Sequence, residues 1–221
     1  MRIFDVLGPV MIGPSSSHTA GAARIGLTAR KLLGEAPVWA DIRLHGSFAQ
    51  TGIGHGTDRA LIAGLLGMKP DDPRLADSFA VAGQEGLSFR FSTVELRNAH
   101  PNTVLLQLRG AGGRELEIVA SSVGGGRIRV CEIDGVTAIF SGEMNTLIVH
   151  NLDQPGHLSE VTSALSMRHI NVANMQLYRN GRGGSAVMVL ECDQPIPQEL
   201  ASWLRTIPGI TKVTRLNLEV E

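Results

Sequence analysis

Apolar residues recur with a helical period in two stretches near the start of the chain. In residues 14–33 the apolar positions are three or four residues apart, and Ser16 or Ser17 can cap a helix that Gly34 ends. These positions are Ala22, Ile25, Ala29 and Leu32. Residues 56–66 carry a second apolar cluster of this kind, and Val38–Leu44 between the two is typical of a strand. The pattern therefore predicts two helices around an early strand.

From residue 88 the pattern changes to short runs with β-branched and apolar residues. We expect strands over Ser88–Phe91, Thr93–Arg97, Val104–Leu108, Glu115–Ala120 and Arg127–Ile133. Glycines at 110–113 and 124–126 interrupt these runs, as turns between antiparallel strands do. Helices early and strands late predict an α+β domain with a largely antiparallel sheet.

The last part of the chain repeats strand and helix patterns in a different order. Strands are predicted over Leu147–His150, Asn171–Tyr178, Ala186–Leu190 and Ile210–Leu216, with helices after Pro155-Gly156 and over Pro197–Thr206. Asn180-Gly181 and Gly183-Gly184 form the turn of a hairpin. This βαββαβ order is the ferredoxin-like plan. We expect one domain over residues 1–143 and a second over residues 144–221.

Composition and charge exclude several classes of protein. Lys and Arg total 20 against 21 Asp and Glu, which lacks the basic excess of a nucleic-acid binder. No apolar run reaches about 18 residues, and the first twenty residues do not resemble a secretory signal. Cys131 and Cys192 make neither a disulfide framework nor a metal motif. A cytoplasmic protein without nucleic-acid or membrane partners is expected.

The first cluster of candidate chemistry is the segment Gly-Pro-Ser-Ser-Ser-His-Thr at residues 13–19. Ser15, Ser16 and Ser17 place hydroxyls at a predicted helix start, where free backbone N–H groups attract an anion such as a carboxylate. His18 follows directly. A helix cap with a surface histidine is the simpler alternative.

Three further clusters follow in the same predicted domain. The segment 46–58 includes three closely spaced glycines, Gly52, Gly54 and Gly56, which allow a ligand to approach the backbone. His55 lies just ahead of a predicted helix start, and Asp58 suits a cap or orienting group. His100-Pro101-Asn102 lies between two predicted strands, and Ser122 precedes three glycines. Each segment also has a purely structural interpretation. The segment 46–58 could be a glycine-rich connector, His100-Pro101-Asn102 a turn, and the segment from Ser122 a β-bulge.

The segment Asn-Leu-Asp-Gln-Pro-Gly-His-Leu from residue 151, with His-Ile-Asn-Val from residue 169, resembles an ACT domain. These small regulatory modules often pair their sheets and bind amino acids at the pairing interface. Some ACT domains sense serine, and polar side chains at three positions hold the ligand there. The resemblance implies that Asn151, Asp153 and Asn171 occupy these positions in this chain and bind an effector. Those members have His and Asn at the first two places, so this chain departs from their pattern. A module that only dimerises is the alternative.

In their order and spacing, the four clusters of the first domain resemble the β subunits of iron–sulfur-dependent L-serine dehydratases, over about 125 residues. The same region is similar to the allosteric substrate-binding domain of some phosphoglycerate dehydrogenases, which also stands next to an ACT domain. The resemblance implies conversion of L-serine to pyruvate and ammonia. In this family a [4Fe–4S] cluster held by three cysteines acts as the Lewis acid for the leaving hydroxyl.

Two cysteines are too few for such a cluster, so the resemblance implies a partner α subunit that carries it, with none bound by this chain alone. This chain would supply one wall of a composite site. His18 and His55 are the candidates for proton transfer. The substrate would contact Ser15, Ser16, Ser17, His100, Asn102 and Ser122. Homodimerisation through the N-terminal domain, the ACT domain or both is expected.

Two other functions remain open from the sequence. The chain could be a serine-sensing regulatory protein without a catalytic role. It could also be a metal-dependent hydrolase with His18, His55, His100 and Asp58 as ligands, although the spacings between these histidines match no short metal motif.

Overall fold

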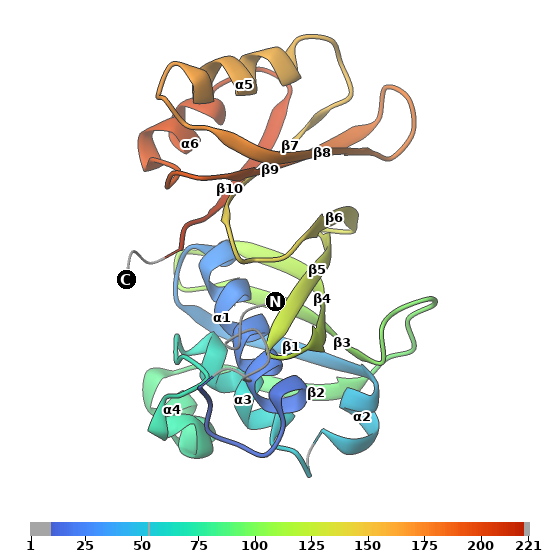
Figure 1. Cartoon of the computed structure of the whole chain (residues 1–221), viewed down its shortest axis with the longest axis vertical. Helices are drawn as coiled ribbons and strands as arrows, with labels where there is room; N and C mark the ends of the chain where they lie inside the picture. Colours follow the sequence, from blue (N-terminus) through green and yellow to red (C-terminus); the bar gives the residue numbers. More distant parts are fainter. Residues whose placement is uncertain (1–9, 53, 219–221) are drawn as a thin grey trace, which may run out of the picture. The chain divides into compact units, whose positions relative to one another are not determined.

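The chain divides into two compact units between Asp134 and Gly135 (Figure 1). The computed structural model describes residues 10–52 and 54–218. Within these ranges, no helix combines the length and apolar composition that a membrane crossing requires.

The first unit is built on a mixed sheet whose strands run in the order β2-β1-β3-β4-β5. β1 and β2 are parallel, and every other neighbouring pair in this series is antiparallel. The strands are β1 (Pro37–Gly46), β2 (Ser88–Thr93), β3 (Asn102–Gly110), β4 (Glu115–Gly124) and β5 (Arg127–Ile133). The expected α+β class with a largely antiparallel sheet is confirmed.

One expected strand, Thr93–Arg97, is wrong. β2 ends at Thr93, and the following residues leave the sheet as a loop. The His45 side chain holds this loop, because Leu96 N donates to His45 Nδ1 at 3.2 Å. The sequence near residue 96 does not indicate this contact, because His45 lies 51 residues earlier in the chain.

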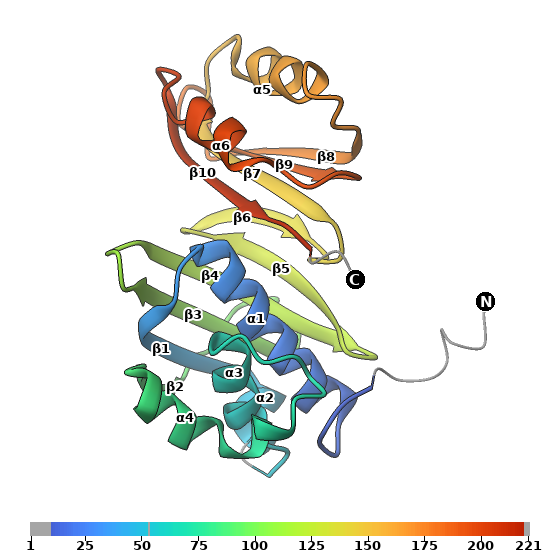
Figure 2. The same cartoon turned by 90° about the vertical axis from the view of Figure 1, so that its left-hand side faces the viewer.

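Helices cover one face of this sheet, as Figure 2 shows for α1 and α3. The helical segments are η2 (Ser16–Gly21), α1 (Ala22–Leu33), α2 (Ser47–Thr51), α3 (Thr57–Leu65), η3 (Pro73–Asp77) and α4 (Ser78–Glu85). The strands turn fully buried side chains, among them Ile42, Leu106 and Ile118, into the core. Gly34 ends α1 in the left-handed conformation, as expected, and its N–H donates to Arg30 O.

Two glycines allow α1 and α3 to cross at close range. A Cβ on Gly64 would lie 2.6 Å from Leu27 N and 2.9 Å from the Cα of Gly26. A Cβ on Gly26 would in turn lie 2.9 Å from Leu65 N. Both glycines are helical, so their role is to remove side-chain bulk where two backbones meet. This crossing fixes α1, and with it the segment that leads into α1.

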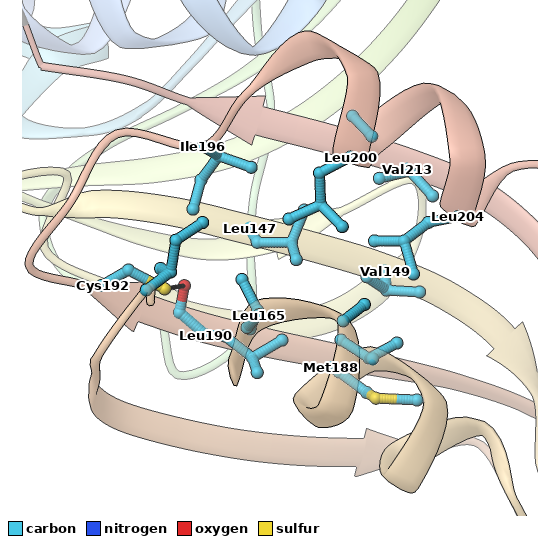
Figure 3. Packing of buried hydrophobic residues seen from close by; sticks show 14 of the residues in the cluster. Leu147, Val149, Leu165, Met188, Leu190, Cys192, Ile196, Leu200, Leu204 and Val213 are labelled. Carbon is cyan, nitrogen blue, oxygen red and sulfur yellow. Dashed lines mark hydrogen bonds between the residues drawn. The ribbon is translucent and has the colours of Figure 1, made fainter. Parts of the chain in front are cut away.

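The second unit contains β6 (Val136–Phe140) and the predicted βαββαβ series, which is confirmed. The series is β7 (Asn145–Leu152), α5 (His157–Ser166), β8 (Val172–Arg179), β9 (Ser185–Cys192), α6 (Gln198–Leu204) and β10 (Ile210–Leu216). Its sheet has the order β10-β7-β9-β8 with antiparallel neighbours. The two helices pack on one face of this sheet over the apolar core drawn in Figure 3, where Leu147, Leu165 and Leu200 meet.

The unit boundary lies nine residues before the one expected after residue 143. The strand β6 was not predicted, and it belongs to the second unit. There Gln176 Nε2 donates to Ile139 O at 3.2 Å, and Ser141 Oγ donates to Glu191 at 3.4 Å. These contacts join residues 139 and 141 to the second sheet.

Substitution of Gly64 tests the α1–α3 crossing. We expect Gly64→Ala to lower the free energy of unfolding by about 1–3 kcal/mol, because the added methyl meets backbone atoms that cannot move aside easily. Urea unfolding of the full chain measures this change.

The matched control is Gly83→Ala on α4, where an added Cβ meets nothing within 4 Å. Alanine is the better helix former there, so stability should rise by roughly 0.5–1 kcal/mol. Equal midpoints for Gly64→Ala and the unsubstituted chain would show that the crossing tolerates a methyl group.

Candidate active site

The Ser-Ser-Ser-His segment forms the start of a long helix with a widened first turn. Ser15 O accepts from Thr19 N at 2.8 Å, as in an α-helix, and also from Ala20 N at 3.4 Å, a five-residue step that is typical of the π-helix η2. The cap is Ser15, whose Oγ accepts from His18 N at 3.1 Å, and not Ser16 or Ser17 as predicted. π-turns inside longer helices occur frequently at functional sites. Here the widened turn brings Ser16, Ser17 and His18 to the beginning of the helix.

Ser122 supports this turn from inside the unit. Its side chain is fully buried, and a Cβ on Gly21 would lie 2.7 Å from the Ser122 Cβ. Within the described residues, Ser122 Oγ has no hydrogen-bond partner. Ser122 therefore lies beneath η2 in this chain, and its expected contact with substrate stays a prediction.

A turn between β2 and β3 anchors the short helix α2. Ser47 N donates to Pro101 O at 2.7 Å, and a Cβ on Gly46 would lie 2.6 Å from the same oxygen. The turn itself is fixed because Asn102 N donates to His100 Nδ1 at 3.1 Å. The His100–Asn102 segment thus holds α2 in place from the neighbouring strand.

The imidazole of His18 lies against α2. Its Nε2 is 3.1 Å from Ser47 Oγ and 3.1 Å from Thr51 Oγ1. Its ring meets Phe48 edge-on, with 5.3 Å between the ring centroids. Ser47, Phe48 and Thr51 were not predicted as site residues. Both hydroxyl residues lie in the 46–58 segment on which the family resemblance rests, and they are four residues apart, one turn of a helix.

His55 completes a pair of imidazoles. Its ring centroid is 4.9 Å from that of His18, and its Nδ1 is 3.0 Å from Thr51 O. Thr19 Oγ1 donates to His55 O at 3.1 Å, which ties the loop that carries His55 to η2. The structure therefore brings together the two histidines that the sequence singled out as proton-transfer candidates.

The environment lowers the pKa of His18 below its ordinary value. Partial burial is the largest cause, and the positive charge of a protonated His55 acts in the same direction. A hydrogen bond with the Ser47 backbone opposes them. His18 is consequently neutral at pH 7, the form of histidine that accepts a proton.

The remaining candidates of the first unit have other surroundings. Asp58 lies in the first turn of α3, where its carboxylate accepts from Arg59 N at 2.8 Å; Gly56, and not Asp58, is at the cap position of this helix. His100 is exposed and lines a cavity of about 360 Å³ with Ser121, Arg129 and Cys131, among others. Neither His18 nor His55 is among the residues that line this cavity.

The two cysteines do not fit an iron–sulfur cluster. Cys131 is in the first unit and Cys192 in the second. Burial raises the pKa of both thiols, that of Cys192 to about 11, whereas clusters bind thiolates. Within the described part of the chain, no three His, Cys, Asp or Glu side chains are grouped so that they could hold a metal ion.

The three effector candidates of the second unit are not gathered within one chain. Asn151 is buried near the end of β7. It pairs with Ala186 of β9, and Ala186 also pairs with Arg179, the last residue of β8, so Asn151 lies at that end of the sheet. Asp153 accepts from Gly183 N at 3.0 Å near the same end. Asn171 precedes β8, where it donates to Asp193. Eight residues of β8, roughly 25 Å of extended strand, separate the two ends.

Comparison with family models matches residues 2–85 to the serine dehydratase beta chain and residues 145–209 to the ACT domain. The chain is 39% identical over 212 residues to the L-serine dehydratase beta chain of Peptoniphilus asaccharolyticus, covering 96% of this chain and 94% of that protein. It is 40% identical over 214 residues to the probable L-serine dehydratase beta chain of Bacillus subtilis, covering 97% of each.

A D-3-phosphoglycerate dehydrogenase of Methanocaldococcus jannaschii is 35% identical over 89 residues, which cover 40% of this chain and 17% of that enzyme. The resemblances inferred from the sequence motifs are confirmed by these matches. The similarity to the two beta chains extends over nearly the whole length of each protein.

Replacement of His55 tests the electrostatic coupling of the two rings. We expect His55→Gln to raise the pKa of His18 towards its ordinary value near 6.5, because a positive charge 4.9 Å away is removed. Titration of the His18 ring by NMR measures the change. His169→Asn, which removes an exposed imidazole in the second unit, should leave the midpoint where it was. A midpoint unmoved by His55→Gln would contradict the coupling.

Proposed function

Because the chain belongs to the family of L-serine dehydratase beta chains, we propose that it supplies one wall of an active site that converts L-serine to pyruvate and ammonia. The observation that carries the proposal is the paired arrangement of His18 and His55 at the start of η2. Both come from motifs on which the family resemblance rests. The reaction must remove the α-proton of serine and release the β-hydroxyl group, so it needs a base beside the substrate.

The start of η2 is suited to the substrate carboxylate. Ser16 and Ser17 begin a helix that continues without a break into α1, so their N–H groups lie at the positive end of an extended helix dipole. Both residues are half-buried. The Ser15 hydroxyl is committed to capping His18 N. In the proposal, Ser16 and Ser17 hold the carboxylate while Ser15 holds the turn.

His18 is the proposed base. It directly follows the proposed carboxylate site, and its lowered pKa keeps the ring neutral at pH 7. His55 assists by discouraging protonation of His18 before substrate arrives. Asn102 and His100 act by anchoring α2 through the turn that includes Pro101.

The electrophile would come from another chain. A [4Fe–4S] cluster supplies a Lewis acid for the leaving hydroxyl, and the cysteines of this chain do not fit it. We therefore place the cluster on a partner α subunit that faces the start of η2. The same dependence separates this function from that of a serine sensor, which needs no such partner.

The second unit would pair with a second copy along β8. β8 is an edge strand, and it exposes Met175 (43%) and Leu177 (51%). Two copies related by a twofold axis would set their β8 strands antiparallel. Asn171 of one copy would then reach the end of the sheet that carries Asn151 and Asp153 of the other. In this proposal an amino-acid effector binds between two copies, not within one.

Reconstitution tests the catalytic assignment. Mixed anaerobically with a cluster-bearing α chain, this chain should yield pyruvate from L-serine, and neither chain should do so alone. We expect His18→Gln to lower kcat by about 10²–10⁴-fold, the usual contribution of a general base. Replacing Ser16 and Ser17 together by Ala removes two hydroxyls and keeps the backbone N–H groups, so KM should rise about tenfold through the lost side-chain hydrogen bonds while part of the carboxylate site remains.

His169→Asn is the control variant and should retain full activity. Serine binding by this chain without any gain of activity on mixing would instead identify a regulatory sensor. Full activity of His18→Gln would remove that histidine from the chemistry while leaving the subunit assignment in place.

Charge on the β8 edge tests the pairing. We expect Met175→Lys with Leu177→Lys to reduce the sedimentation coefficient of the chain to that of a smaller assembly, because lysines on the paired edge would be desolvated. Trp203→Lys on α6 is the matched control, since that side chain is also 43% exposed. An unchanged sedimentation coefficient for the β8 variant would exclude this edge as the interface.

A further inference from the structure

The hydroxyl group of Thr51 has a single proton, and its neighbours determine where that proton goes. Thr51 Oγ1 lies 2.9 Å from the backbone oxygen of Ser47. A carbonyl oxygen only accepts hydrogen bonds, so this bond exists only if Thr51 donates. The proton of Thr51 is therefore committed to the first turn of α2.

His18 Nε2 approaches the same hydroxyl from the other side. It is 3.1 Å from Thr51 Oγ1, an oxygen that has no second proton to give. The bond forms if Nε2 carries the hydrogen and donates it. Ser47 Oγ fits the same arrangement. It lies 3.3 Å from Thr51 Oγ1, to which it can donate, and 3.1 Å from His18 Nε2, from which it can accept. Every donor in the group then has an acceptor.

The other ring nitrogen, Nδ1, takes no part in the bonds to these two hydroxyls. Within the described residues, both hydrogen bonds from the His18 ring to side chains go to Nε2. In a neutral imidazole only one nitrogen carries a proton, so a proton on Nε2 makes Nδ1 the basic atom. The hydroxyls of α2 thus determine which ring nitrogen of His18 can accept a proton.

We propose that Ser47 and Thr51 are positioning residues that hold neutral His18 as the Nε2–H tautomer, so that Nδ1 accepts the α-proton of L-serine. This inference rests on the proposed function. The Cα–H bond breaks and an Nδ1–H bond forms, which makes the ring an imidazolium. The electron pair left on Cα forms the Cα–Cβ double bond as the hydroxyl group departs from Cβ with its own pair. The ring then returns its proton to solvent.

The positioning pair is anchored through the start of α2. Ser47 and Thr51 are one helical turn apart on α2, and the start of that helix is fixed by the bond from Ser47 N to Pro101 O. Phe48, between them in sequence, is fully buried and packs its ring against His18. The pair therefore presents two hydroxyls to the imidazole before substrate binds.

The tautomer can be read in the free full-length chain. Nitrogen-15 NMR at a pH where His18 is neutral should show a protonated Nε2 and an unprotonated Nδ1. In Thr51→Val, which keeps the shape of the side chain but removes its hydroxyl, the two tautomers should become mixed. Thr51→Ser should restore the Nε2–H form. A wild-type ring with its proton on Nδ1 would overturn the inference, whatever the activity.

Kinetics of the reconstituted enzyme test the consequence for the reaction. We expect Thr51→Val to lower kcat about tenfold to a hundredfold, because part of the neutral His18 would then carry its proton on Nδ1 and could not accept another there. KM should change little, because the carboxylate site remains. Thr51→Ser should recover most of kcat. Unchanged kcat in the Ser47→Ala, Thr51→Val double variant would contradict the positioning role. If the wild-type mixture forms no pyruvate, the proposed function fails, and the NMR result still decides the tautomer.

Discussion

The candidate site depends on the meeting of one imidazole nitrogen with two hydroxyls, His18 Nε2 with Ser47 and Thr51. His18 lies in η2, whereas Ser47 and Thr51 lie in α2, so the packing of the first unit must place the two helices correctly. η2 continues into α1, whose position is fixed where Gly26 meets Gly64. α2 follows β1 and is held by the turn before β3. A shift of either helix by about an ångström would separate the hydroxyls from the ring.

The same packing explains why so many small residues surround the site. Gly21 makes room for Ser122, and Gly46 makes room for Pro101. At each of these places the backbone passes so close to a neighbour that a methyl group would collide with it. The high glycine content, 26 of 221 residues, therefore reflects in part close approaches around the site. Such approaches place polar groups accurately without a large aromatic core.

Local patterns in the sequence predicted most of the secondary structure and both histidines. Gly34 and the Pro155-Gly156 step act within a few residues, so their effects are visible in the sequence. The run of serines indicated the helix start but not which serine caps it, which is Ser15. The contacts of Ser47 and Thr51 with His18 span 29 and 33 residues, and no periodic pattern reports them. The separation of Asn151 from Asn171 likewise follows from strand register, which the sequence of either strand alone does not reveal.

The central claim is that His18 faces L-serine in a site completed by a second chain. The most direct measurement is a structure of this chain assembled with a cluster-bearing α chain and L-serine under anaerobic conditions. Our account predicts His18 Nδ1 about 3–3.5 Å from the substrate Cα, with the substrate carboxylate at the start of η2. A substrate held entirely by the α chain, with His18 turned away from it, would contradict the account.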